Sequence, residues 1–312
     1  MRRIMLTTFV IIAGLVLTSS GLAGAHRDDD PVVRAVEQLT RSNQWQLERS
    51  VPLAFATHHP QGFARFGDRL FMSTVEIIER PVIGPTPDGY DRTPGRGQGH
   101  LLVMDLDGRL QSDIPLGEGH MYHPGGIDVD SSGTVWVPVA EYRPNSHAIV
   151  YAVDARTLAV REVFRYGDHV GGIVSDTTDG KLHGVSWGSR RLFSWTPSGQ
   201  LLRRAANESH FADYQDCAAY DFHKAVCTGI TEYRNPPATG RFDLGAIAVL
   251  DLLSDTVGHE VPVTVLSPAG HAITRNPVHL EVVGGALHLW AAPDDADEPG
   301  GTTLLEYSTP LP

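Results

Sequence analysis

Short apolar runs, each broken by a polar turn, recur along the chain from about residue 45 to the C-terminus. Each unit is typical of two strands joined by a tight turn, because Asp, Ser and Gly favour the backbone that such turns need. The turns lie at residues 66–68, 130–133, 176–180, 221–223 and 283–285. A third strand follows in each unit and a fourth in most, whereas helical periodicity is nearly absent after residue 42. The pattern predicts an all-β protein.

The five units also open alike, which marks them as internal repeats. Their first strands begin at His59-Pro-Gln-Gly, His123-Pro-Gly-Gly, His169-Val-Gly-Gly, Tyr214-Gln-Asp-Cys and Asn276-Pro-Val-His. Four antiparallel strands repeated radially are the blades of a β-propeller. The last repeat has no fourth strand, but residues 46–53 resemble the fourth strand of the first repeat, residues 109–116. We therefore predict a five-bladed β-propeller closed by an N-terminal strand over residues 45–53. The alternative is six blades, with hidden strands in residues 77–99 or 233–245.

The N-terminal residues predict export. Two arginines precede an apolar run over residues 4–17, and Ala23-Gly24-Ala25 is typical of a cleavage site, so residues 1–25 are expected to be a signal peptide. The run is too short for a membrane span. Residues 26–44 then form a tail with a short helix over residues 31–41, and residues 45–312 form one propeller domain. We expect a secreted or otherwise extracytoplasmic protein.

The two cysteines bear on the compartment in which the protein acts, and the net charge bears on which classes of partner it can bind. Cys217 and Cys227 fall opposite each other in a predicted hairpin, so a disulfide is expected in an oxidising compartment. The formal net charge is −12, and removal of the signal with its two arginines makes it −14. This balance disfavours nucleic acid and anionic membranes as partners. It is compatible with a small-molecule ligand, and it leaves the oligomeric state open.

Two strand patterns carry a resemblance to a known group of propellers. Gly126-Ile-Asp-Val-Asp-Ser-Ser-Gly-Thr-Val-Trp-Val137 and Ile149-Val-Tyr-Ala-Val-Asp154 resemble the gluconolactonase, strictosidine-synthase and NHL-repeat superfamily. The whole chain resembles secreted bacterial propeller proteins of unknown function. Many gluconolactonase-like propellers hold calcium with a Glu, Asn and Asp set in the channel, and this sequence has no residue-by-residue counterpart of that set. The resemblance therefore implies the architecture and leaves the chemistry open.

Aligning the repeats places polar residues in two rings. The first ring opens the inner strands: His59, His123, His169, Tyr214 and Asn276. The second ring leaves the neighbouring strands 17 or 18 positions later: Glu76, Glu141, Trp187, Glu232 and Asp294. Because these two strands are antiparallel, both rings are expected at one face, together with the insertions at residues 77–99, 142–147, 233–245 and 295–301. His58, His120, His210 and His271 also fall near this face, and we interpret them as solvated loop residues.

The ring residues suggest a metal-dependent hydrolase or lyase acting on a small polar substrate. His59, His123 and His169 are the predicted ligands of a divalent metal with an open coordination position. Glu141 and Glu232 are the predicted catalytic carboxylates. The predicted substrate contacts are Arg143 and Arg234 for an anionic group, Trp187 for stacking, and Glu76, Asp294, Tyr214 and Asn276. Two alternatives remain: a non-catalytic propeller that binds a ligand or protein, and a scaffold in which both rings serve structure.

Overall fold

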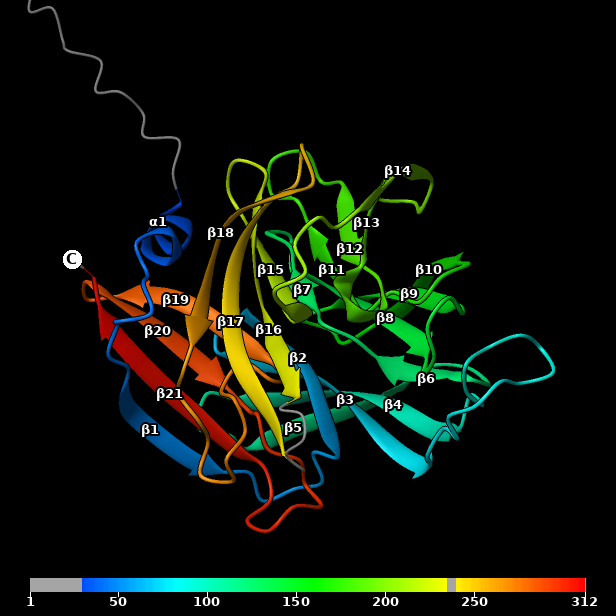
Figure 1. The fold of residues 1–312 in the computed structure, drawn as a ribbon, viewed down its shortest axis with the longest axis horizontal. Coiled ribbons are helices and arrows are strands. Elements are labelled where there is room, and N and C mark those ends of the chain that lie inside the picture. The colour runs from blue at the N-terminus through cyan, green and yellow to red at the C-terminus, as the bar shows by residue number, and fades with distance from the viewer. Residues whose placement is uncertain (1–29, 235–239, 312) are drawn as a thin grey trace, which may run out of the picture.

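The computed structural model describes residues 30–234 and 240–311. It contains five antiparallel sheets arranged around a central channel, so the predicted five-bladed propeller is confirmed (Figure 1). Blade 1 comprises β2 (His59–Phe66), β3 (Arg69–Glu79), β4 (Arg96–Asp105) and β5 (Leu110–Leu116). Blade 2 comprises β6 (Met121–Pro124) with the short β7 (Asp128–Val129), β8 (Thr134–Glu141), β9 (Ala148–Asp154) and β10 (Val160–Tyr166).

The remaining blades repeat this order from the channel outward. Blade 3 comprises β11 (Gly172–Ser175), β12 (Leu182–Val185), β13 (Arg191–Trp195) and β14 (Leu201–Ala206). Blade 4 comprises β15 (Asp213–Tyr220), β16 (Lys224–Arg234), β17 (Arg241–Asp251) and β18 (Thr256–Val263). Blade 5 comprises β19 (Val278–Val283), β20 (Ala286–Ala291), β21 (Thr303–Pro310) and, as its outermost strand, β1 (Gln46–Pro52).

The pairing of β1 with β21 closes the ring, as the repeat in residues 46–53 predicted. The two strands are antiparallel, with Gln46 opposite Ser308 and Pro52 opposite Thr303. In the described residues the insertion between β3 and β4 adds only an isolated bridge between Ile83 and Arg92, so no sixth blade forms there. A hydrogen-bonded closing strand covers an edge of β21 that would otherwise be free to pair with another chain.

The apolar core lies between the blades. Five clusters of buried side chains each join one blade to the next. On β3, Phe71 packs toward blade 2, whereas Leu70 and Met72 pack toward blade 5. Because both faces of a blade are covered in this way, the inner strands carry near-continuous apolar runs rather than strict alternation.

A short helix, α1 (Pro31–Glu37), covers the junction of blades 4 and 5 (Figure 1). The Asp30 side chain caps it by accepting a hydrogen bond of 2.7 Å from the Val32 amide, and Pro31 occupies the first turn, where no amide is needed. Val32, Val33 and Val36 are buried in the core between the two blades. The helix is shorter than the predicted 31–41.

Asp216, on the inner strand β15 of blade 4, ties three other blades to the channel axis. Its fully buried carboxylate accepts hydrogen bonds from the backbone amides of Phe63 (2.7 Å), Ile127 (3.1 Å) and Val278 (3.2 Å). These donors belong to blades 1, 2 and 5. Burial raises the pKa of the Asp216 carboxyl, against the effect of the three amides.

Asp128 makes a second tie of the same kind from blade 2. Its Oδ2 accepts hydrogen bonds from the amides of Ser175 (3.0 Å, blade 3) and Ala219 (3.3 Å, blade 4). Burial raises the pKa of Asp128 to about 7. We call Asp128 and Asp216 the channel carboxylates. Together they join the inner strands of all five blades through backbone amides.

The predicted disulfide is confirmed, and it lies in blade 4. Cys217 of β15 and Cys227 of β16 are directly opposite each other and are bonded. Neither of the two helices in residues 30–234 and 240–311 is long and apolar enough to span a bilayer. The predicted signal peptide, residues 1–25, lies outside the described residues.

Candidate functional site

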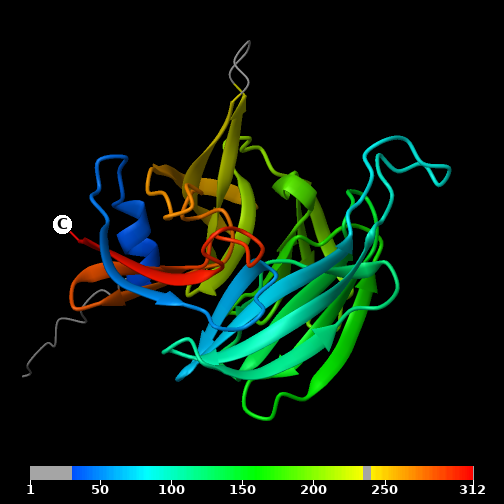
Figure 2. The same ribbon diagram turned by 90° about the horizontal axis from the view of Figure 1, so that it is seen from below.

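A cavity of about 1040 Å³, here called the mouth cavity, opens at the end of the channel where the inner strands begin. All five members of the first predicted ring line it: His59, His123, His169, Tyr214 and Asn276. From the second ring, Glu76, Trp187 and Glu232 line it. The segment between β3 and β4 and the β16–β17 hairpin project from the same side of the ring (Figure 2). The structure thus places most of the two rings around a single opening.

One wall of the mouth cavity is aromatic. The His123 ring stacks on Tyr142 with centroids 4.1 Å apart, and Tyr142 lies 5.7 Å from Trp187. Trp187 also meets the edge of His169 at 4.9 Å. The guanidinium of Arg92 lies 4.8 Å from the Trp187 ring centroid. Such a wall offers flat apolar surface for a ring-shaped or planar ligand.

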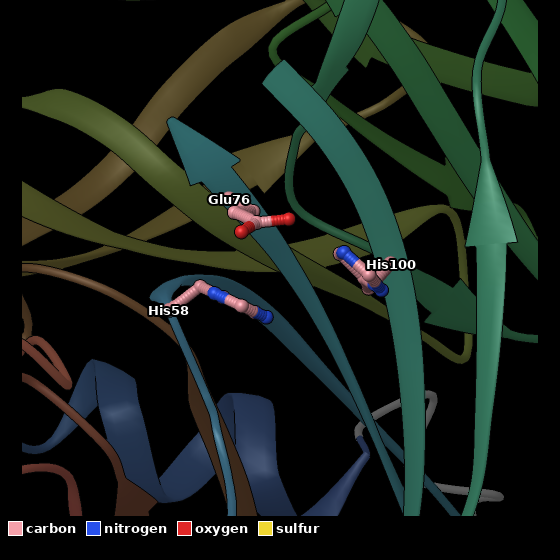
Figure 3. Close-up of side chains that lie close together, drawn as sticks. All are labelled: His58, Glu76 and His100. Carbon is pink, nitrogen blue, oxygen red and sulfur yellow. The ribbon is translucent and has the colours of Figure 1, made fainter. Parts of the chain in front are cut away.

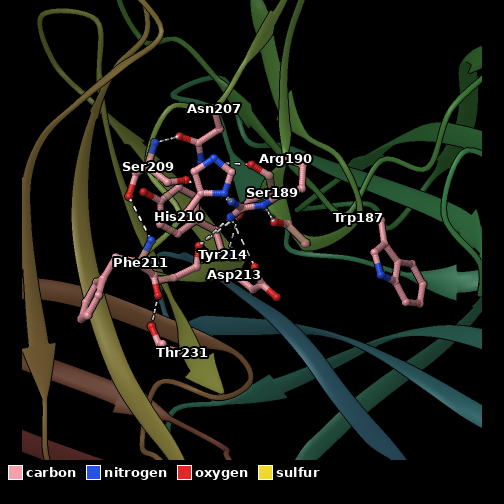
Figure 4. A network of polar contacts seen from close by, with 12 residues as sticks. Trp187, Ser189, Arg190, Asn207, Ser209, His210, Phe211, Asp213, Tyr214 and Thr231 are labelled. Carbon is pink, nitrogen blue, oxygen red and sulfur yellow. Dashed lines mark hydrogen bonds and ion pairs between the residues drawn. The ribbon is translucent and has the colours of Figure 1, made fainter. Parts of the chain in front are cut away.

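Arg190 holds the loop that presents Trp187 (Figure 4). Its guanidinium donates hydrogen bonds to the carbonyls of Gly188 (2.5 Å), Ser209 (3.1 Å) and Ala212 (3.2 Å). Ser189, between them, has a left-handed φ of 48°, which only surrounding contacts maintain in a residue other than glycine. The tryptophan is therefore carried by a loop fixed from both sides rather than by a free one.

The histidines of the wall are buried and neutral. His123 is 7 % exposed, and its Nε2 has no hydrogen-bond partner among the described residues. Burial lowers the pKa of His123 well below its usual value. Burial also lowers the pKa of His169 to about 4, and its Nδ1 lies 2.9 Å from the carbonyl oxygen of Glu141. Neutral imidazoles can bind ligands or metals through the free nitrogen.

The three predicted metal ligands share the cavity but not a common centre. The rings of His123 and His169 are 6.4 Å apart, and Nδ1 of His59 lies 2.6 Å from Asp295. In the described chain, three groups bring three ligand atoms within 4.8 Å of one another, and the His59, His123 and His169 set is not one of them. The structure therefore gives this set no coordination geometry.

The positive charges of three arginines act on the phenol of Tyr142. Burial raises the pKa of the Tyr142 hydroxyl, and Arg80, Arg92 and Arg275 each act against that shift. All three line the mouth cavity. Arg92 is paired with Asp91 at 2.8 Å and Arg275 with Asp295 at 3.2 Å, whereas Arg80 is exposed and makes no ion pair with another described residue. Three arginines thus lie in the cavity lining together with five carboxylates: Glu76, Asp213, Glu232, Asp295 and Asp297.

The expected roles of Glu141 and Arg143 require correction. Both side chains are buried outside the cavity lining, and Nε of Arg143 lies 2.5 Å from Oε2 of Glu141. Arg143 also pairs with Asp88 at 2.8 Å and lies 3.6 Å from the Tyr90 ring centroid. Asp88 and Tyr90 belong to the insertion after β3. The pair therefore fastens that insertion onto blade 2, so that Glu141 is not placed as a base, nor Arg143 as a substrate contact.

Asp294 is also turned away from the cavity. It accepts hydrogen bonds from Ser267 (2.5 Å) and lies 3.0 Å from Nδ1 of His271. Its neighbour Asp295 lines the cavity and contacts His59 instead. Because β20 ends at Ala291, the repeat spacing no longer fixes which side chain faces inward at this point.

The other predicted substrate contacts differ in their surroundings: some are hydrogen-bonded within the protein and others are exposed at the cavity. The Tyr214 hydroxyl lies 3.1 Å from Glu260, and the Asn276 amide donates to the carbonyl of Pro293 at 3.3 Å. Glu76 and Glu232 are exposed at the cavity. The Arg234 side chain lies outside the described part of the chain. Glu76 and Glu232 are therefore the second-ring carboxylates that line the cavity.

Comparison with known proteins places the chain in a family. The sequence profile of DUF6454, a family of unknown function, matches residues 22–311. The chain belongs to the DUF6454 family. No curated protein matches its sequence. The family assignment accordingly carries no activity for this DUF6454 protein.

Several solved structures are similar to this DUF6454 protein at low sequence identity. Hydrazine synthase from Kuenenia stuttgartiensis is 12% identical (TM-score 0.40), with 78% of this chain and 59% of that chain covered. The propeller domain of the trilobed protease from Pyrococcus furiosus is 11% identical (TM-score 0.34; 76% and 65%). The tail fiber of Staphylococcus aureus phage P68 is 10% identical (TM-score 0.50; 89% and 55%). The chain thus spans less than two thirds of each. The resemblance to the gluconolactonase superfamily stays a prediction.

Proposed function

We propose that the mouth cavity binds a small ligand that carries a carboxylate or phosphate group next to a flat ring or apolar face. The observation that carries this proposal is the presence of Arg80, Arg92 and Arg275 in the lining of the mouth cavity, with the Arg92 guanidinium 4.8 Å from the Trp187 ring centroid. Guanidinium groups suit planar, bidentate recognition of carboxylates and phosphates, and the indole suits stacking. The unpartnered Nε2 of His123 adds one buried polar contact for the ligand.

The exposed carboxylates at the rim restrict the chemical class of the proposed ligand further. Glu76 and Glu232 line the cavity and accept hydrogen bonds only. A ligand that carries hydroxyl or amino groups as well as an anionic group fits both kinds of wall. Sugar acids and amino-acid-like carboxylates have this composition. The proposed class is therefore a small polar acid rather than a lipid or a purely apolar compound.

A thermal-shift screen with sugar acids, hydroxy acids, amino acids and phosphate esters tests this function. We expect at least one class to raise the Tm, and R80A to weaken its binding about tenfold or more, because one charge-assisted contact contributes about 1.5–3 kcal/mol. R96A is the matched control, since Arg96 is 68% exposed in its side chain and lies outside the lining. The proposal fails if none of these compounds shifts the Tm, or if R80A and R96A bind equally well.

A metal-dependent hydrolase or lyase is the second candidate. It is favoured by a group of ligand atoms from His58, Glu76 and His100, because His58 and Glu76 belong to the cavity lining. We also propose that the protein acts outside the cytoplasm, which the Cys217–Cys227 disulfide supports. Its negative net charge of −12 disfavours nucleic acid and anionic membranes as partners.

A further inference from the structure

The structure assigns a site for a divalent transition metal of the zinc type to His58, Glu76 and His100, a set that we call the rim triad (Figure 3). One ligand atom from each of the three side chains lies within 4.8 Å of the other two. This inference goes beyond ligand binding in the mouth cavity and does not depend on it. It also replaces the His59, His123 and His169 set with different residues.

The fold brings the rim triad together in two steps. His100 of β4 is paired with Thr74 of β3, so His100 and Glu76 lie on the same face of blade 1, two positions apart along β3. The Thr74 hydroxyl donates a hydrogen bond to the carbonyl of Thr57. That bond holds the preceding loop over β3, and His58 follows with a left-handed φ of 53°.

The two imidazoles lie next to each other, and His100 has one ring nitrogen free for a metal. The rings of His58 and His100 are stacked, 4.9 Å apart. Nδ1 of His100 lies 2.8 Å from Oδ1 of Asp113, and its Nε2 is buried without a partner in the described chain. A carboxylate on one ring nitrogen fixes the tautomer that leaves the other nitrogen free to bind a metal. Asp113 is thus the positioning residue of His100.

The other two groups with suitable spacing are satisfied by their own ion pairs. In one, His271 lies 3.0 Å from Asp294 through Nδ1 and 3.4 Å from Glu298 through Nε2. In the other, Nδ1 of His223 lies 2.6 Å from Asp176, while Lys181 neutralises Asp179 at 2.5 Å. Among the described residues, neither the His58 imidazole nor the Glu76 carboxylate is engaged in a hydrogen bond or ion pair. The rim triad alone therefore offers free ligand atoms on all three members.

The donor set selects the metal. Two imidazoles and one carboxylate suit Zn²⁺ and its neighbours in the transition series, whereas Ca²⁺ and Mg²⁺ prefer oxygen ligands throughout. A tetrahedral zinc spaces its ligand atoms about 3.3 Å apart, so the exposed Glu76 side chain and the His58 ring must close in slightly on binding. Since His58 and Glu76 line the mouth cavity, the fourth position would face the space where a ligand sits.

Titration of the chelator-stripped protein with Zn²⁺, followed by calorimetry, tests the assignment without any organic ligand. We expect one tight site, and a visible absorption spectrum of tetrahedral type when Co²⁺ is used instead. H58A and H100A should each weaken Zn²⁺ binding more than about 100-fold, since even an outer-shell partner contributes 10–100-fold. E76Q serves as a third variant in case a histidine change disturbs folding, because Glu76 is exposed.

Three further variants separate the alternatives. D113N should weaken Zn²⁺ binding about 10–100-fold while keeping the Co²⁺ spectrum, as expected of a positioning residue. H120A, an exposed histidine on a nearby loop, should bind as the wild type does. Loss of binding in H123A but not in H100A would overturn the assignment, as would the absence of tight Zn²⁺ binding. Either result would leave the anion screen with R80A unaffected, so the two proposals fail separately.

Discussion

Buried polar groups occur both in the middle of the channel and at its mouth, but their partners differ. In the middle, the channel carboxylates Asp128 and Asp216 accept five backbone amide hydrogen bonds from all around the ring. At the mouth, the Nε2 atoms of His123 and His100 are buried without any partner in the described chain. A buried polar atom with partners stabilises the fold, whereas one without them is destabilising unless something else binds it. The difference separates a structural centre from the rim at which we propose binding.

The largest expected effect on stability comes from removing the channel carboxylate of Asp216. D216A leaves the amides of Phe63, Ile127 and Val278 buried without acceptors. We expect the free energy of unfolding to fall by about 5 kcal/mol or more, since each unsatisfied group costs about 1–3 kcal/mol. Urea unfolding followed by tryptophan fluorescence measures it. E76Q, at the rim, is the control, and equal stability of the two variants would remove the distinction between centre and mouth.

The second channel carboxylate predicts a pH dependence. Burial raises the pKa of Asp128 to about 7, above the value of about 3.9 in an unfolded chain, so protonation favours the folded state. This contribution is complete below about pH 4 and is lost as the pH rises through 7, with a total on the order of 4 kcal/mol. D128N should flatten that part of the stability profile between pH 4 and 8. An unchanged profile in D128N would show that the amides, not burial, control Asp128.

Breaking the buried Glu141–Arg143 ion pair is expected to have the next largest effect on stability. R143A leaves the buried carboxylate of Glu141 with only the exposed His147, at 3.1 Å, as a basic partner, and we expect a loss of about 3 kcal/mol in the free energy of unfolding. The insertion held by Asp88 and Tyr90 should also become sensitive to limited proteolysis. Zn²⁺ affinity at the rim triad should stay within a few-fold. If R143A is as stable as the wild type, Arg143 has no structural role and its place as a substrate contact reopens.

The smallest effect on stability is expected at the mouth itself. R92K keeps the charge but loses the planar stacking over Trp187, so we expect a change below about 0.5 kcal/mol in the free energy of unfolding. The affinity for an anionic ligand found in the screen should nevertheless fall about tenfold, because lysine cannot keep a planar cation over the Trp187 ring beside the bound anion. A loss of stability comparable to that of R143A would contradict the assignment of Arg92 to binding.

The features that could be predicted from the sequence are those that recur in every repeat or depend on local strand pairing. Five repeats gave the blade number, the likeness of residues 46–53 to 109–116 gave the closing strand, and the hairpin geometry gave the Cys217–Cys227 bond. The gathering of the first ring and of three second-ring residues at one opening followed from strand direction alone. These features depend on local patterns and on the antiparallel return of each strand, which every repeat copies.

The direction of single side chains past the strand ends could not be predicted in this way. Glu141 turns toward Arg143 because the insertion from blade 1 supplies Asp88 and Tyr90, a contact between distant segments. His58, interpreted as solvated, lines the cavity, and His100 gave no signal because it follows an irregular insertion rather than opening a repeat. The roles of the channel carboxylates could not be predicted for another reason. Their partners are backbone amides, which nearly every residue has, so the partner residues show no characteristic residue type.

The closing strand has a consequence for how the protein forms. β1 lies near the start of the described chain and β21 near its end, so the blade they share cannot be completed until nearly the whole polypeptide is available. Contacts between such distant segments form late and slow the overall reaction, because the entropy of a large loop is lost before the contact is gained. During synthesis the first strand therefore stays unpaired until β21 is made, and a chain interrupted before residue 303 would present an incomplete blade to its neighbours.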